Sequence, residues 1–147
     1  MKYLLFDTCF WFGLLCPQDS DHQKAEQMFK EFVNSEVRIL VPYPTLYETL
    51  NTEFVDNKMI LYEFNRILSD KEHVILVDDE KYKDNAYDKT IRQHKDTKVS
   101  LVDNIIMEIA RANEIKVDGI VSFNERDFGP FCKERQMTLF CYPGMVE

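Results

Sequence analysis

The chain has 147 residues and a formal net charge of −8 at pH 7, and 45% of its residues are hydrophobic. This size fits one globular domain, so we expect residues 1–147 to form a single domain with a real core. The acidic balance argues against simple electrostatic binding of nucleic acid, which usually goes with a basic domain.

No apolar run reaches the ~18 residues that a membrane helix needs. The apolar N-terminal stretch is broken by Asp7 and no small-residue cleavage site follows it, so we do not interpret it as a signal peptide. The four cysteines, at positions 9, 16, 132 and 141, show no C-x-x-C pair and no histidine at zinc spacing. We interpret them as reduced, small apolar residues and expect a cytoplasmic protein without a membrane partner.

Strand and helix patterns alternate through the first half of the chain. We expect strands over 2–7, 37–41 and 73–77, separated by helices over 9–15, 22–34, 43–54 and 57–69. In the first helix, the aromatic run over 10–12 favours core packing over base stacking. The helix that begins near Pro44 should bury one face, made of Tyr43, Leu46, Tyr47, Leu50 and Phe54.

The second half continues the alternation. Asp78 and Asp79 are N-cap candidates for a helix over 80–94, and Ser100 caps the strongest helix, over 100–114. That helix should bury Leu101, Ile105, Ile109 and Ala112. The remaining elements are a strand over 119–123, a short helix over 125–135 that Gly129-Pro130 should interrupt, and a strand over 138–141. Short strands separated by helices predict an α/β fold with a parallel sheet.

Four acidic residues lie close to predicted strand ends or helix starts: Asp7, Glu48, Asp103 and Asp127. Taken singly, each has an ordinary explanation as a helix cap, a surface residue or a partner of the helix dipole. Parallel sheets, however, place their active sites outside the carboxyl ends of the strands. Two like charges about 4 Å apart repel by about 4 kcal/mol at an effective dielectric near 20, so convergence of these acids favours a hard divalent cation, Mg²⁺ or Mn²⁺.

Four segments in order along the chain resemble the motifs of one family. The PIN-domain family, and within it the VapC-like toxin ribonucleases, has an opening Asp-Thr/Ser motif, a second-acid helix, a Ser-Leu-x-Asp helix and a closing Thr-x-Asn-x-x-Asp-Phe pattern. The matching segments here are 5–11, 43–50, 101–110 and 121–128. Each match is weak alone, but the ordered set spans nearly the whole chain.

The resemblance implies a three-layer α/β/α sandwich with a five-stranded parallel sheet. It implies a Mg²⁺- or Mn²⁺-dependent ribonuclease whose acidic core is Asp7, Glu48 and Asp103. The fourth position of the metal site falls to Asp127 or to Asn124, because members differ over which polar group of this loop faces the metal.

The resemblance also implies a pocket and partners. Thr8 and Ser122 correspond to the small hydroxyl residues that line the family's pocket. The expected partners are an RNA substrate, a protein antitoxin that lays a peptide into the active-site groove, and a second copy of the chain in a homodimer. The RNA target is not specified by the sequence.

A basic segment precedes Asp103. From Lys81 to Lys98 there are six Lys or Arg residues and three acids, although the chain as a whole is acidic. A solvated helix face explains such a cluster, and a segment that grips phosphates explains it as well. The candidate contacts to the RNA backbone are Arg92, His94, Lys95 and Lys98.

Other classes of protein fit the sequence less well. A receiver-like phosphotransfer domain needs a paired Asp after the first strand, where Asp7 stands alone, and a dehalogenase-type phosphatase needs Asp at position 9, which is Cys. A PIN-like domain that binds RNA or protein without catalysis, and a housekeeping RNA-processing nuclease, remain as alternatives.

Overall fold

The computed structural model describes residues 1–50 and 53–146, apart from the side chain of Glu53. Its centre is a sheet of five strands, all parallel, in the order β3-β2-β1-β4-β5. The strands are β1 Lys2–Phe6, β2 Val37–Pro42, β3 Val74–Val77, β4 Gly119–Val121 and β5 Thr138–Phe140. The predicted five-stranded parallel sheet is therefore confirmed, with ends shifted by one or two residues.

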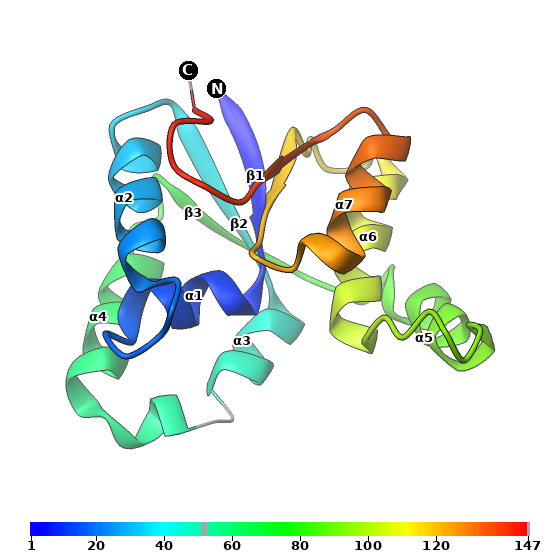
Figure 1. Ribbon diagram of the computed structural model, residues 1–147, viewed down its shortest axis with the longest axis horizontal. Helices are drawn as coiled ribbons and strands as arrows, with labels where there is room; N and C mark the ends of the chain where they lie inside the picture. The colour runs from blue at the N-terminus through cyan, green and yellow to red at the C-terminus, as the bar shows by residue number, and fades with distance from the viewer. Residues whose placement is uncertain (51–52, 147) are drawn as a thin grey trace.

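Helices cover both faces of this sheet, which confirms the predicted three-layer sandwich. They are α1 Thr8–Leu15, α2 His22–Val33, α3 Tyr43–Leu50, α4 Lys58–Leu68, α5 Lys83–Arg92, α6 Leu101–Ala112 and α7 Glu125–Glu134, with a short 3₁₀ turn η1 over Glu53–Asp56. Helices α1, α2 and α4 lie on one side, α6 and α7 on the other, and α5 lies outside α6 (Figure 1).

Alternation along the strands divides the core in two. Leu4 and Phe6 of β1 pack with α1, α2 and α4, whereas Leu5 between them packs with α6 and α7. On the first face Phe6, Phe10 and Trp11 are fully buried, with ring centroids 5.0–5.9 Å apart. Phe10 and Trp11 are thus core, as predicted, and they fix the start of α1 against the sheet, while Phe12 is only partly buried.

The strand order places two strand ends side by side at the centre of the molecule. The chain runs from β1 outward through β2 to β3, then crosses to β4, which pairs with β1 on its other edge. Phe6 and Val121 are partners in this pairing, so the residues that follow them emerge together. This is the reversal point at which open α/β sheets bind ligands.

The predicted buried face of α3 is wrong for three of its five residues. The helix buries Pro44, Thr45, Leu46 and Thr49, while Tyr43, Tyr47 and Leu50 are 37–65% exposed. Phe54 is buried but belongs to η1 rather than to α3. Because α3 follows β2 directly, the course of the chain out of the strand sets its orientation, and its small residues pack against α1 and α6.

Helix α5 begins at Lys83, three residues after the predicted start at residue 80. Its N-cap is Tyr82, while Asp78 Oδ1 accepts a hydrogen bond from Glu80 N at 3.0 Å and Asp79 O accepts one from Tyr82 N at 2.9 Å. The two aspartates therefore stabilise a turn before the helix. Short polar side chains offer the backbone such local alternatives to helix.

Helix α6 confirms its cap but not its whole predicted face. Ser100 Oγ accepts a hydrogen bond from Asp103 N at 3.1 Å, as expected of an N-cap. Leu101 and Ala112 are exposed, whereas every residue from Asn104 to Ala110 is buried. The middle of α6 lies between the sheet and α5, so burial there extends around the helix and its ends remain open.

Pro130 does not interrupt α7, which runs unbroken from Glu125 to Glu134. A proline inside a helix removes the hydrogen bond to the carbonyl four residues earlier, here that of Arg126. Arg126 is exposed, and water can satisfy its carbonyl. Within the described residues, no helix is long and apolar enough to cross a membrane.

Candidate active site

An open cavity of about 350 Å³ lies where β1 and β4 end. It brings together three of the four predicted acids, the predicted pocket residue Thr8, and Asn124, the alternative to Asp127 at the fourth position. Its lining consists of Asp7, Thr8, Cys9, Phe12, Glu48, Ser100, Asp103 and Asn124. Ser122 lies behind this surface and Asp127 lies beside it, so the structure gathers every residue predicted for the acidic site into one region.

Asp7 is the most deeply buried acid of the group, with 4% of its surface exposed. It ends β1 and caps α1, since its Oδ1 accepts a hydrogen bond from Thr8 N at 2.8 Å. Its Oδ2 accepts hydrogen bonds from Ser122 Oγ at 2.8 Å and from Cys9 Sγ at 3.2 Å. Burial raises the pKa of Asp7 more than these donors lower it, and the charge of Asp127 raises it further.

Asp103 lies in the first turn of α6, where Ser100 caps the helix. Burial raises the pKa of Asp103 to about 7, and the charges of Asp7, Glu48 and Asp127 add to the shift. Glu48 reaches the same cavity from α3, although it is exposed to solvent. The acids therefore form one electrostatically connected group.

Asn124 connects the two sides of this group through its side chain and its backbone. Its Nδ2 donates to Asp103 Oδ2 at 3.3 Å and to Asp127 Oδ2 at 3.0 Å. Its backbone N–H donates to Ser122 Oγ at 3.0 Å, and Ser122 in turn donates to Asp7. A continuous chain of hydrogen bonds thus runs from Asp7 to Asp127.

Asp127 is held differently from the other acids. Arg126 Nε donates to its Oδ1 at 3.1 Å and Arg126 Nη2 donates to its Oδ2 at 3.3 Å. Burial opposes ionisation of Asp127, but the hydrogen bonds from Arg126 and Asn124 outweigh it, and its pKa lies below the usual range. The carboxylate lines a neighbouring cavity of about 600 Å³, not the one that contains Asp7.

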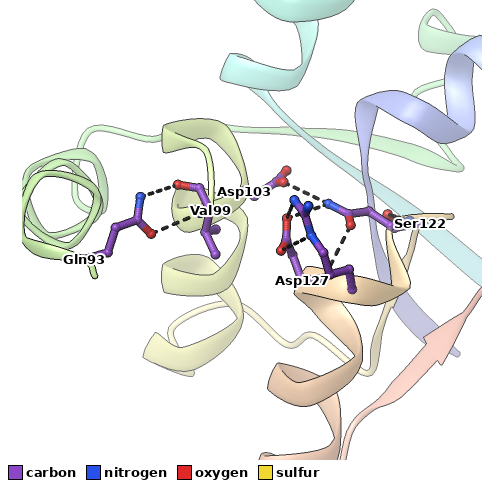
Figure 2. Close-up of polar contacts among 7 residues, drawn as sticks. Gln93, Val99, Asp103, Ser122 and Asp127 are labelled. Atoms are coloured by element: carbon purple, nitrogen blue, oxygen red, sulfur yellow. Dashed lines mark hydrogen bonds and ion pairs between the residues drawn. The ribbon is translucent and has the colours of Figure 1, made fainter. Parts of the chain in front are cut away.

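The predicted basic contacts separate into two groups. Lys95 and Lys98 line the cavity beside Asp127, together with Arg126. Arg92 is instead paired with Asp88 on its own helix, at 2.9 Å, and His94 lies outside both cavities. The loop that carries the two lysines is closed by Gln93, whose side chain bonds Val99 N and Val99 O at 3.1 and 2.8 Å (Figure 2).

Sequence reasoning missed two residues of the site. Cys9 was interpreted as a small apolar residue, yet its Sγ lies 3.2 Å from Asp7 Oδ2 and 3.3 Å from Ser122 Oγ. Burial raises the pKa of Cys9 to about 12, followed by the charge of Asp7, which keeps the group a thiol that donates. Arg126 was missed because an arginine beside an aspartate is common on surfaces. The available signal for both was closeness in sequence to a predicted acid, because Cys9 lies two residues after Asp7 and Arg126 directly precedes Asp127.

The cavity's donor chemistry fits a hard divalent cation. Its carboxylates are of the ligand class that Mg²⁺ and Mn²⁺ prefer. Thr8 Oγ1 is buried in the lining and has no hydrogen-bond partner among residues 1–50 and 53–146, so it can accept water or a ligand oxygen. As placed, no three His, Cys, Asp or Glu side chains of the described residues converge to hold an ion.

The all-parallel sheet between two layers of helices is that of a VapC-like PIN fold. Toxin VapC20 of Mycobacterium tuberculosis, which cleaves the sarcin-ricin loop, superposes with a TM-score of 0.69 and 16% identity, over 86% of this chain and 94% of that one. VapBC2 from Rickettsia felis, solved bound to a DNA fragment from its promoter, superposes with a TM-score of 0.62 and 13% identity, over 93% and 96%. No family model and no curated protein matches the sequence.

Proposed function

We propose that the protein is a metal-dependent ribonuclease that hydrolyses RNA phosphodiester bonds and serves as the toxin of a toxin–antitoxin pair. The observation that carries the proposal is the buried Asp7, which shares a cavity with Asp103 and Glu48 at the reversal point of a VapC-like sheet. The toxin activity of the structural neighbour VapC20 supports the same reading.

Asp7 and Asp103 are the proposed direct ligands, and Glu48 either binds the ion through water or orients the attacking water. When bound, Mg²⁺ or Mn²⁺ supplies a polarised water and stabilises the negative charge that develops on the phosphoryl group. Thr8 N donates to Oδ1 of Asp7, and Ser122 Oγ and Cys9 Sγ both donate to its Oδ2, so these bonds leave one lone pair of Oδ1 for the cavity. The Thr8 hydroxyl is available to hold a water or a phosphate oxygen.

The wall of the cavity contributes by shape. Phe12 lines it and packs edge-on against Phe54 with ring centroids 5.3 Å apart, so one side is apolar and fixed. A low-dielectric wall strengthens electrostatic interactions beside it. We infer that this wall limits the water around the carboxylates while leaving the open side for an extended strand of RNA.

An antitoxin is the expected protein partner. The cavity presents carboxylates, which accept bidentate hydrogen bonds from arginine, so an antitoxin segment with a basic side chain would both fill the groove and neutralise it. VapBC2, the second structural neighbour, is a complex with promoter DNA, which supports this pairing. A cytoplasmic homodimer remains part of the proposal.

The experiment is incubation of the purified protein with mixed RNA in Mg²⁺, Mn²⁺ or EDTA, with Asp7→Asn and Asp103→Asn in parallel. We expect cleavage with either metal, none with EDTA, and a severe loss in both variants. Cleavage that persists in EDTA and in both variants would sink the proposal. RNA binding without cleavage by the wild type would indicate a PIN-like binding domain instead.

A further inference from the structure

The fourth acidic residue differs from the other three in where its carboxylate lies. Asp7, Glu48 and Asp103 line the cavity at the ends of β1 and β4. Asp127 lines the adjoining cavity, together with Arg126, while Asn124 takes the place on the wall between Asp103 and Asp127. The amide and the fourth carboxylate therefore have different positions relative to the proposed metal.

Both oxygens of Asp127 already have strong partners. Arg126 contacts them through two nitrogens, at 3.1 and 3.3 Å, and Asn124 Nδ2 adds a third donor at 3.0 Å. The side chain of Asp127 is 10% exposed and that of Arg126 is 79% exposed, so the guanidinium closes the outer side of the carboxylate. A carboxylate paired with a fixed cation has less charge to offer a second cation.

Asn124 gains its orientation from this pair. Besides its bond to Asp127, it donates the same amide group to Asp103 Oδ2, and its Oδ1 accepts a bond from Asp127 N at 3.4 Å. Asp127 thus contacts Asn124 at two points, one through its side chain and one through its backbone. Groups that hold a metal ligand's neighbour in place typically change metal affinity or activity by 10–100-fold when they are removed.

We propose that Asn124 is the fourth polar group of the metal cavity and that Asp127, neutralised by Arg126, is a positioning residue that holds Asn124 against Asp103. This inference rests on the proposed metal-dependent function. It assigns the metal to Asp7, Glu48 and Asp103, and it gives Asp127 a role that an uncharged amide can also fill, since an amide oxygen accepts from Asn124 as well.

The test compares Asp127→Asn with Asp127→Ala. The asparagine keeps an oxygen that accepts from Asn124 Nδ2, whereas the alanine removes it. A metal ligand would lose its charge in both variants, but a positioning residue is rescued by the conservative one. The readouts are the melting temperature during MnCl₂ titration, which rises when a metal binds the folded state, and cleavage of a labelled RNA.

We expect Asp127→Asn to keep the MnCl₂ concentration at half-maximal shift within about 3-fold of wild type, and Asp127→Ala and Asn124→Ala to raise it by about 10-fold or more. Asp103→Asn, a direct-ligand control, should abolish the shift. Circular dichroism of the metal-free variants shows whether each one folds.

The outcomes separate the inference from the function on which it rests. If the wild type shows neither a thermal shift nor cleavage, the metal site itself fails and the inference with it. If the wild type shows both but Asp127→Asn loses the shift as fully as Asp103→Asn, Asp127 is a ligand and only the inference is overturned. Equal retention by Asp127→Asn and Asp127→Ala also overturns it, because Asp127 then positions nothing.

Discussion

Asp7 and Asp127 lie on the two sides of one site and are held in opposite ways. Asp7 ends β1, and its donors among the residues that the structure describes are all neutral: Thr8 N, Cys9 Sγ and Ser122 Oγ. Asp127, in the first turn of α7 beyond β4, is paired with the cation of Arg126. Neutral donors orient a carboxylate and leave its charge uncancelled, whereas a guanidinium cancels it.

The pKa directions agree with this difference. The pKa of Asp7 is raised, chiefly by burial, and that of Asp127 is lowered because its hydrogen bonds outweigh burial. Burial therefore disfavours ionisation of Asp7 on the β1 side, whereas the hydrogen bonds of Asp127 favour its ionisation on the β4 side. A carboxylate at a strand end can bind a ligand or stabilise the fold, and the charge of its nearest hydrogen-bond donor decides between these two roles.

The largest expected effect is on the β1 side. Asp7→Asn should lower RNA cleavage by about 10³-fold, since a metal ion contributes several kcal/mol of stabilisation to the transition state. The same change should raise the melting temperature of the metal-free protein, because it removes a buried charge that repels its neighbours. Single-turnover cleavage and thermal denaturation in EDTA measure the two effects, and unchanged cleavage would refute the assignment.

The neutral donors of Asp7 should matter next. Ser122→Ala removes the hydroxyl that donates to Asp7 Oδ2 and accepts from Asn124 N. We expect a loss of cleavage of about 10–100-fold, as is typical when a group that orients a metal ligand is removed. Ser69→Ala is the matched control, because its hydroxyl donates to the carbonyl of Asn65 at the end of α4, far from the acids of the site. Equal activity of the two variants would contradict an orienting role.

Asp103 predicts how the site responds to pH. Its pKa in the folded state is raised to about 7, so the folded protein holds a proton that the unfolded chain releases at lower pH. The stability contribution is present below the unfolded pKa and is lost as pH rises through about 7. Metal-free wild type should therefore lose stability between about pH 4 and 7, and Asp103→Asn should lose less.

The same ionisation predicts that metal binding strengthens as pH rises, whereas the stability of the metal-free protein falls. The metal competes with the proton for the Asp103 carboxylate, so below the pKa the MnCl₂ concentration at half-maximal thermal shift should rise about tenfold for each unit by which the pH is lowered. Titrations at pH 5.5, 6.5 and 7.5 check the slope. A midpoint independent of pH would show that Asp103 does not bind the ion.

The smallest expected effect concerns the cations of the β4 side. In an Asp7→Asn background that leaves RNA intact, Lys95→Gln with Lys98→Gln should weaken binding of a fluorescent single-stranded 12-mer. If each lysine meets one phosphate, the slope of log affinity against log salt should fall by about 1.4, so affinity changes about 7-fold less between 50 and 200 mM salt. Arg92→Gln is the control, since Arg92 is paired with Asp88, and an equal effect there would contradict the separation.

Local patterns predicted most of the fold because they concern neighbours along the chain. The apolar run of β1, the cap at Ser100 and the proline in the first turn of α3 act within one turn or strand, and they are where the sequence placed them. The errors lie where distant packing decides. The buried face of α3 and the burial around α6 depend on which elements cover them, and no local periodicity carries that information.

The sequence by itself determined the alternation of strands and helices, the parallel sheet and the set of acids at its carboxyl edge, because these follow from hydrophobic period and strand direction. Only the tertiary structure decided how each acid is held. Cys9, near the start of the chain, and Ser122, near its end, donate hydrogen bonds to the same oxygen of Asp7. Arg126 forms an ion pair with Asp127. The pairing of β1 with β4 brings Ser122 to Asp7, whereas Arg126 and Cys9 are near their acids in sequence. These partners together give the division of the acids between metal and structure that we propose.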